Sequence, residues 1–130
     1  MGLDIGTTST IGVVLNTLNH KIIFQSSRSV KLYSKKTGWA EEDPNQWWLN
    51  TQSILNEIGF FSKNKKINIC SIGVTGMLPA LVILDKNNQV IRYSIQQSDS
   101  RVEKELKSIL KNKKEKENFT KSTKCGVNQQ

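Results

Sequence analysis

Residues 1–16 read MGLDIGTTSTIGVVLN, and this stretch decides the fold. A short strand-like run at 2–5 is followed by Gly6 and an unbroken hydroxyl run, and a second apolar run occupies 11–15. Glycine and hydroxyl residues between two apolar runs favour a tight turn between strands. A third run at 22–30 follows the turn-forming sequence NTLNHK. The sequence therefore predicts a three-stranded antiparallel meander.

The turn between the first two strands carries polar groups suited to phosphate. Its backbone N–H groups and hydroxyls would gather donors in one concavity, which suits phosphate oxygens. Asp4, at the end of the first strand, would offer a hard oxygen ligand to a nucleotide-bound Mg²⁺, through water. The residues of this predicted phosphate turn are Gly6, Thr7, Thr8 and Ser9. The same residues also suit a plain polar β-turn capped by Asp4, and both interpretations stay open on this pattern alone.

A helix is predicted after the polar segment YSKKTGWAEED. Asp43 is a good N-cap and Pro44 suits the first helical position. The helix is predicted over 44–58, about four turns, with an apolar stripe at helical spacing. The stripe consists of Trp47, Trp48, Leu55 and Ile58.

Beyond this helix, the run INICSIGV at 67–74 is continuous and β-branched, as in strands buried on both faces. A helical crossover into such a strand predicts parallel pairing with the first strand. ALVILD at 80–85 and VIRYSI at 90–95 predict a hairpin. A second helix is predicted from Arg101, with Val102, Leu106, Ile109 and Leu110 on one face and with Ser100 and Glu103 as its capping box. The predicted class is α/β with a mixed sheet.

Composition excludes several function classes. The chain has 130 residues and a net charge of +8, but only three of its 19 basic residues are arginine, and lysines gather in Asn- and Glu-rich runs. Such runs are typical of solvated surfaces, so nucleic acid is not a predicted partner. No apolar run is long enough for a membrane span and no signal peptide is recognisable, which predicts a cytoplasmic location without membrane contact. Cys70 and Cys125 are too far apart in sequence to indicate a metal site.

Four stretches, taken in order, carry a family resemblance: GLDIGTTST, GWAEEDPNQWW, SIGVTGMLPALVILDKNNQVIR and SIQQSDSR. Together they resemble the beginning of the FGGY carbohydrate kinases, most closely the xylulokinase-like members. The resemblance implies the ribonuclease H-like fold of actin-like ATPases, with ATP and sugar between two domains. It also implies transfer of the ATP γ-phosphoryl to a hydroxyl of a ketose, polyol or sugar acid, with Mg²⁺ as cofactor and a ketose such as xylulose favoured.

The resemblance also assigns residues. Asp4 matches the family's aspartate that orients Mg²⁺ and the phosphates, and the turn beginning at Gly6 matches the segment approaching them. Met77 and Leu78 match two consecutive substrate-contacting positions. The second is often His in xylulokinases, and its replacement leaves the sugar open. The remaining expected sugar contacts are Asp99 and, in place of a family tryptophan, Gln96 or Gln97.

The resemblance covers 1–130 as an incomplete N-terminal kinase domain, about its first half, without the C-terminal domain. The family's general base, an aspartate in a Gly-Gly-Gly-Asp stretch, matches nothing here. We therefore expect a fragment that is inactive alone, ending at KCGVNQQ inside a domain, with the remaining part of the kinase as its partner. Two alternatives are a non-catalytic sugar- or nucleotide-binding module and another actin-like ATPase, such as a dehydratase activator. The cysteine-ligated clusters of those activators do not match Cys70 and Cys125.

Overall fold

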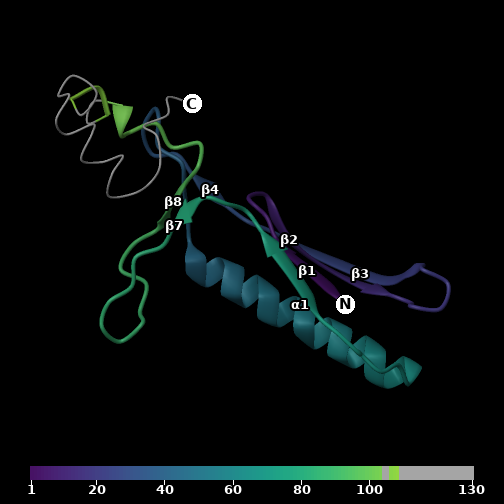
Figure 1. Ribbon diagram of the computed structural model, residues 1–130. Coiled ribbons are helices and arrows are strands. Elements are labelled where there is room, and N and C mark those ends of the chain that lie inside the picture. The colour runs from purple at the N-terminus through teal and green to yellow at the C-terminus, as the bar shows by residue number, and fades with distance from the viewer. Residues whose placement is uncertain (104–105, 109–130) are drawn as a thin grey trace, which may run out of the picture.

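The computed structural model describes residues 1–103 and 106–108, which form one long helix and two small sheets (Figure 1). The first sheet has the order β3-β2-β1-β6. Its strands are β1 (Gly2–Ile5), β2 (Ser9–Leu15), β3 (Ile22–Ser29) and β6 (Gly73–Gly76). The predicted meander is confirmed by the antiparallel pairs β1–β2 and β2–β3. Parallel pairing across the helix is also confirmed, with Leu3 opposite Val74.

Helix α1 (Pro44–Lys65) begins where the sequence predicts. The Asp43 carboxylate accepts a hydrogen bond from the Asn45 N–H at 2.9 Å, and Pro44 is the first helical residue. The helix continues beyond the predicted end at residue 58 because its last two turns still pack on the sheet. Phe61 stacks on Phe24 of β3 with ring centroids 4.8 Å apart.

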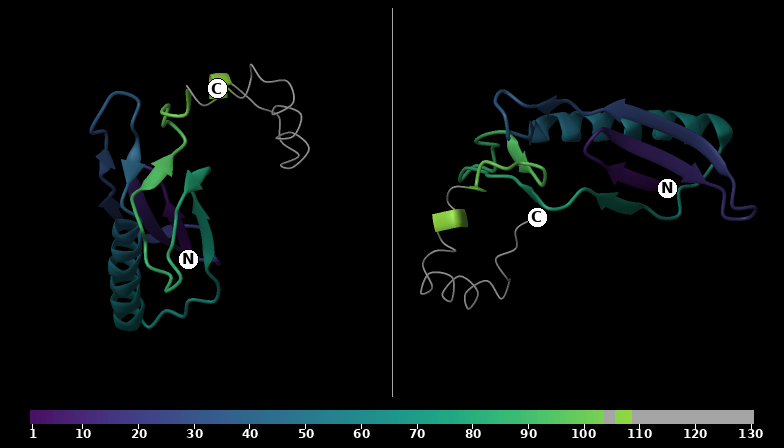
Figure 2. Two further views of the ribbon diagram at one scale, coloured as in Figure 1. Left: turned by 90° about the vertical axis from the view of Figure 1, so that its left-hand side faces the viewer. Right: turned by 90° about the horizontal axis from the view of Figure 1, so that it is seen from above.

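Helix α1 covers one face of the first sheet (Figure 2). Leu3 and Val14 pack against Ile54 and Ile58 to form the buried core. The approach is close: a Cβ added at Gly12 would lie 2.3 Å from Ile54 Cγ2. The predicted stripe is therefore partly wrong, because the helix buries Thr51, Ile54, Ile58 and Ser62 while leaving Trp48 60% exposed and Leu55 37% exposed.

The second sheet has the order β4-β5-β8-β7. Its strands are β4 (Leu32–Tyr33), β5 (Glu41–Glu42), β8 (Ser94–Gln96) and β7 (Ala80–Leu81). The predicted hairpin over 80–95 is confirmed by antiparallel pairing of β7 with β8 and a bridge between Leu84 and Val90. Asp85 closes its turn, since its carboxylate accepts from the N–H groups of Asn87 and Gln89, both at 2.8 Å.

The strand predicted over 67–74 is displaced and more exposed than expected, since residues 67–72 lie outside any strand and β6 spans Gly73–Gly76. Pairing with β1 begins only at Gly73, and Ile72 and Val74 are 61% and 65% exposed. The reason is its place in the sheet. β6 is an edge strand, and α1 packs on β1, β2 and β3, so no described element covers β6.

The predicted capping box of the second helix is wrong. Ser100 Oγ donates to the Gly38 carbonyl at 3.5 Å, and the Glu103 carboxylate forms an ion pair with Lys107 at 2.7 Å. A helical hydrogen bond joins the Leu106 N–H to the Val102 carbonyl at 2.8 Å, but Val102 is 55% exposed. Ile109 and Leu110 lie outside the described residues. Within the described ranges, no helix is long and apolar enough to cross a membrane.

Candidate functional site

The turn between β1 and β2 closes tightly. The Gly6 N–H donates to the Ser9 carbonyl at 3.0 Å, and the Thr8 carbonyl accepts from the Val30 N–H at 2.9 Å. A Cβ at Gly6 would lie 3.1 Å from Ser9 O and 3.7 Å from Asp4 Oδ2. The missing side chain therefore leaves a small space between the turn and the Asp4 carboxylate, bordered by two oxygen atoms, which suits a cation or its water ligands.

Asp4 lies on the sheet face opposite helix α1, because strand residues alternate and its neighbour Leu3 belongs to the core. It lines a hollow of about 460 Å³ whose other walls include Ile11, Val13 and Val74. Among the described residues, no group of three or more His, Cys, Asp or Glu side chains could enclose a metal. A single carboxylate fits Mg²⁺, which takes most of its ligands from water and substrate phosphate.

Part of the predicted site comes together in a cavity of about 650 Å³ between the phosphate turn and the segment after β8. Thr7 and Thr8 line one side, and Gln97 and Asp99 line the other. The full lining comprises Thr7, Thr8, Val30, Leu32, Glu42, Gln96, Gln97, Ser98, Asp99 and Ser100. Hydroxyl and amide groups on an apolar base suit a polyhydroxyl ligand.

Met77 and Leu78 lie outside this cavity. The Met77 N–H donates to the Ile5 carbonyl at 2.9 Å, which extends the β6–β1 ladder to the phosphate turn. The Leu78 side chain is 80% exposed. The predicted site residues thus fall into two groups. One lines the cavity, and the other lies outside its lining and consists of Asp4, Gly6, Ser9, Met77 and Leu78.

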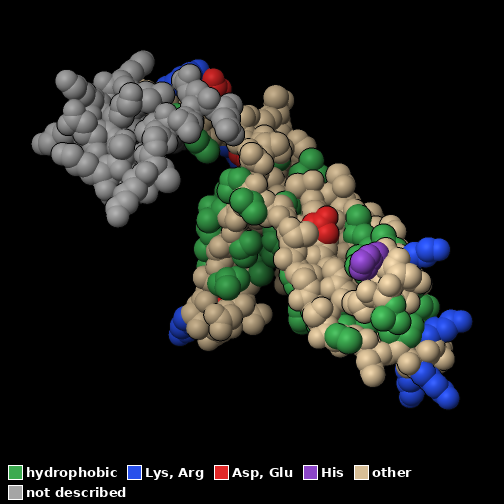
Figure 3. Space-filling model, turned by 45° about the vertical axis from the view of Figure 1, so that its right-hand side comes forward, with side chains coloured by type: hydrophobic (Ala, Val, Ile, Leu, Met, Phe, Trp, Pro, Cys, Tyr) green, Lys and Arg blue, Asp and Glu red, His purple; other side chains and the backbone are tan. Residues whose placement is uncertain are grey.

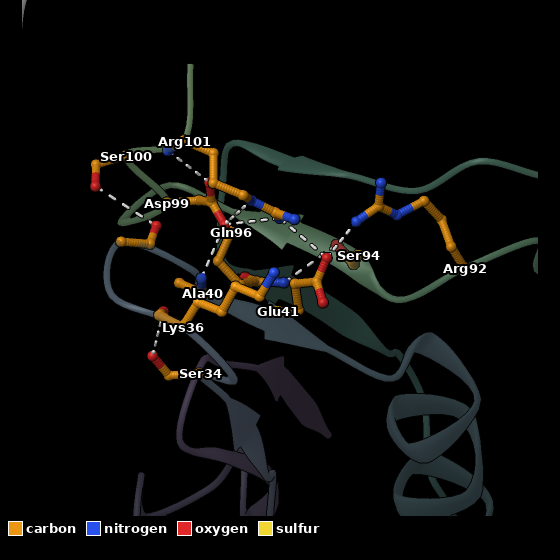
Figure 4. A network of polar contacts seen from close by, with 11 residues as sticks. Ser34, Lys36, Ala40, Glu41, Arg92, Ser94, Gln96, Asp99, Ser100 and Arg101 are labelled. Atoms are coloured by element: carbon orange, nitrogen blue, oxygen red, sulfur yellow. Dashed lines mark hydrogen bonds and ion pairs between the residues drawn. The ribbon is translucent and has the colours of Figure 1, made fainter. Parts of the chain in front are cut away.

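Asp99 is held by protein partners on both carboxylate oxygens (Figure 4). Oδ2 accepts from the Ala40 N–H at 2.8 Å, and Oδ1 accepts from the Arg101 N–H at 3.1 Å. The Arg101 side chain donates to both oxygens. These hydrogen bonds from Arg101, opposed by burial and aided by the backbone donors, lower the pKa of Asp99 to about 2. Asp99 therefore stays ionised and fastens the cavity wall to β5.

Sequence reasoning missed Glu41, which completes this network. Its carboxylate is 7% exposed and pairs with Arg101 at 2.9 Å and with Arg92 (Figure 4). Arg101 also stacks on Trp39, with its guanidinium carbon 4.1 Å from the ring centroid. Two of the chain's three arginines pair with this one glutamate.

Glu42, the next residue, faces a different environment. It is fully buried and lines the cavity. Its Oε2 accepts from the Trp47 indole N–H at 2.9 Å, whereas Oε1 has no hydrogen-bond partner. Burial raises the pKa of Glu42, and the Trp47 hydrogen bond only partly opposes the shift. No motif in the sequence distinguishes this glutamate from the two acidic residues beside it.

The fold and the β1–β2 turn together define the class of protein. A meander, a helical crossover, a parallel strand and a glycine-hydroxyl turn beside an aspartate are the opening elements of an actin-like ATPase fold. The family model for the N-terminal domain of the FGGY family of carbohydrate kinases matches residues 1–129. The chain belongs to this family.

Relatives agree in sequence and in structure. The chain is 31% identical over 101 residues to xylulose kinase of Bacillus subtilis, covering 78% of this chain and 20% of that protein. Its fold matches the crystal structure of xylulose kinase from Rhodospirillum rubrum with a TM-score of 0.83 and 42% identity, covering 99% of this chain and 26% of that one. It also matches Plasmodium falciparum glycerol kinase with ADP, with a TM-score of 0.80 and 23% identity, over 98% and 27% of the two chains. The chain thus spans about a quarter or less of these relatives.

Proposed function

We propose that this chain is the first part of an ATP-dependent kinase that phosphorylates a hydroxyl of a sugar or polyol, with a ketose such as xylulose favoured. The observation that carries this proposal is the meeting of the Thr7–Thr8 turn with Gln97 and Asp99 around one cavity. A phosphate-binding turn and polar sugar-binding groups must be adjacent for a phosphoryl group to pass between two bound substrates. Membership of a carbohydrate kinase family supports the same reaction.

In this proposal the β1–β2 turn receives the phosphates of ATP. The N–H groups of Thr7 and Thr8 and the hydroxyls of Thr7, Thr8 and Ser9 would supply donors, because the Gly6 N–H already donates to the Ser9 carbonyl. Gly6 would contribute by the absence of a side chain, which keeps the turn open beside Asp4. Asp4 would hold Mg²⁺ through water. Bound Mg²⁺ would neutralise phosphate charge, which is the main demand of phosphoryl transfer.

The sugar side of the site is proposed at Gln97, Asp99, Met77 and Leu78. The Gln97 amide can both donate to and accept from hydroxyls. Asp99 already binds Ala40 and Arg101, so we propose that it also orients the segment carrying Gln97. Met77 and Leu78 would contact the sugar from the end of β6, where Leu78 is open to a ligand.

We further propose that the chain requires the remaining part of the kinase, including the general base, and is inactive alone. Large apolar side chains lie open along the hairpin and β6 (Figure 3). They include Ile72, Val74, Leu78, Leu81, Leu84 and Ile91, all at least 48% exposed. Exposed apolar area of this kind marks a binding surface for further protein. The longer relatives make the rest of the kinase domain the natural occupant.

A chimera tests the function directly. This chain would replace the matched first part of Rhodospirillum rubrum xylulose kinase, to which it is 42% identical. We expect Mg·ATP and D-xylulose to give sugar-dependent ADP release, and Asp4→Ala to remove it. Glu103→Ala, a change at an exposed carboxylate, is the matched control. A folded chimera that phosphorylates no ketose or polyol would contradict the proposal.

A further inference from the structure

Glu42 lines the cavity and has one carboxylate oxygen, Oε1, without a hydrogen-bond partner. Its side chain is fully buried, and only Oε2 has a partner, the indole N–H of Trp47 at 2.9 Å. Buried polar atoms are nearly always hydrogen-bonded, and leaving one without a partner costs free energy. Oε1 has under 1 Å² of accessible surface, so a ligand in the cavity that Glu42 lines brings a donor to it only when the Glu42 side chain turns toward the cavity.

The charge of the cavity wall narrows the identity of that ligand. The described lining residues include two carboxylates and neither Lys nor Arg. Asp99 is neutralised by Arg101, but no described cation lies within ion-pair distance of Glu42. A carboxylate on the ligand would therefore meet the like charge of an ionised Glu42. A neutral hydroxyl would instead donate a hydrogen bond.

We propose that Glu42 selects the substrate: its Oε1 accepts a hydrogen bond from a hydroxyl of a neutral sugar or polyol, and its negative charge disfavours sugar acids. This inference rests on the proposed function and narrows its substrate class. Ketoses and polyols remain, whereas aldonates and similar anions are disfavoured. Glu42 is thus a specificity-determining residue to which the stretch GWAEEDPNQWW assigned no role.

A purely structural role for Glu42 makes a different prediction. If the residue only holds Trp47, then Glu42→Gln keeps that hydrogen bond through its amide oxygen and leaves ligand preference unchanged. If Glu42 selects the ligand, the same substitution keeps a group able to bind hydroxyl but removes the repelling charge. The ratio of neutral to acidic ligand binding therefore separates the two roles, whereas stability does not.

The experiment uses the 130-residue chain and saturation-transfer NMR with D-xylulose, glycerol and D-gluconate at about pH 8, which is well above the ordinary pKa of a glutamate. In the unchanged chain we expect the two neutral ligands to bind about tenfold or more tightly than gluconate, because the gluconate carboxylate meets the like charge of Glu42. Glu42→Gln should bring the three affinities within about threefold of one another. Glu42→Leu should weaken the neutral ligands by about tenfold.

Glu57→Gln removes one negative charge from helix α1 outside the cavity and is the matched control. It should leave the preference unchanged. An equal preference in the unchanged chain and in Glu42→Gln, an effect equally produced by Glu57→Gln, or no sugar binding at all would overturn the inference. Circular dichroism verifies that each variant is folded. Since the chimera measures phosphoryl transfer separately, failure of this selection and failure of the kinase proposal remain distinguishable.

Discussion

Arg101 clamps Asp99 from the side chain, with its Nε 2.9 Å from Oδ1 and 3.0 Å from Oδ2. The same guanidinium reaches Glu41 of β5 at 2.9 Å, and Asp99 reaches the Ala40 N–H at 2.8 Å. The segment that carries Gln97 is therefore fixed at two points, to Glu41 of β5 and to Ala40 just before that strand. Most of this clamp lies outside the cavity, yet it determines where one cavity wall lies.

The clamp predicts a pH-dependent stability. A carboxyl whose pKa falls to about 2 on folding stabilises the fold above its unfolded pKa, near 3.8, and loses that contribution as the pH falls from there to about 2. Asp99→Asn should destabilise the chain at neutral pH by roughly 1 to 3 kcal/mol, as for hydrogen bonds to charged groups. Urea unfolding followed by tryptophan fluorescence would measure the difference across this range.

Asp85→Asn is the control for the Asp99 substitution, because Asp85 closes an exposed hairpin turn without an ion pair among the described residues. The gap between Asp99→Asn and the unchanged chain should close as the pH approaches 2. A gap that stays constant from pH 7 to about 2 would show that ionisation of Asp99 does not link to folding.

The contact between β2 and α1 gives a second prediction. A Cβ at Gly12 would lie 2.3 Å from Ile54 Cγ2 and 3.2 Å from Ile58 Cδ1, inside the buried core. Gly12→Ala must displace the helix or its side chains, and overpacking of this kind costs about 1 to 3 kcal/mol. Thermal unfolding by circular dichroism would measure the loss.

Gly59→Ala makes the same chemical change as Gly12→Ala but should stabilise the protein. Gly59 lies in the exposed part of α1, and an added Cβ would meet nothing within 4 Å. Replacing a helical glycine by alanine stabilises by about 0.5 to 1 kcal/mol. Equal effects at the two positions would show that helix propensity, rather than the closeness of sheet and helix, governs Gly12.

Removal of the Glu42 charge should stabilise the folded protein at neutral pH. Because burial raises its pKa, the folded state holds the proton more tightly than the unfolded state. The fold is therefore most favoured below the unfolded pKa and loses stability as the pH rises through the raised folded pKa. Glu42→Gln should remove this loss and be more stable than the unchanged chain at neutral pH but not at pH about 4. Urea titrations at the two pH values would detect it, and greater stability of the unchanged chain at neutral pH would contradict it.

Local signals explain what the sequence could predict. Gly6 with its hydroxyl neighbours placed a turn, and Asp43 with Pro44 placed a helix start, because both depend on nearby residues only. The parallel pairing of β6 with β1 followed from the helical crossover between them, which is the usual connection between parallel strands.

Failures arose where distant partners decide. The exposure of Val74 depends on which element packs over its edge strand, and an apolar run in the sequence does not indicate whether such an element is present. Ser100 and Glu103 have the spacing of a capping box, but the Ser100 side chain binds the Gly38 carbonyl and the Glu103 side chain pairs with Lys107. Glu41 and Glu42 are adjacent in sequence and point to opposite environments, which only pairing of β5 with β8 defines.

Asp4 predicts a kinetic signature in the xylulose kinase chimera. Its carboxylate lies beside the space at Gly6, where we propose that Mg²⁺ and phosphate charge must be stabilised. Because the demand for charge stabilisation is greatest during transfer, Asp4→Ala should lower kcat by about a hundredfold or more and change KM for the sugar by only a few fold. Steady-state ADP release with D-xylulose would measure both. An unchanged kcat would remove Asp4 from the mechanism.

The 130-residue chain by itself should phosphorylate no sugar. The attacking hydroxyl needs a positioned base within hydrogen-bond reach, and we propose that this base lies in the remaining part of the kinase. Asp4 also lines a different hollow from the cavity of Thr7 and Thr8, so the described residues do not enclose the carboxylate, phosphates and sugar in one site, and water would screen interactions that are strong only in an enclosed site. ADP release would be measured with Mg·ATP and D-xylulose, L-ribulose, glycerol or gluconate, using Asp4→Ala as the control for background hydrolysis. Sugar-dependent release above that control with any of the four would show that residues 1–130 contain a complete active site.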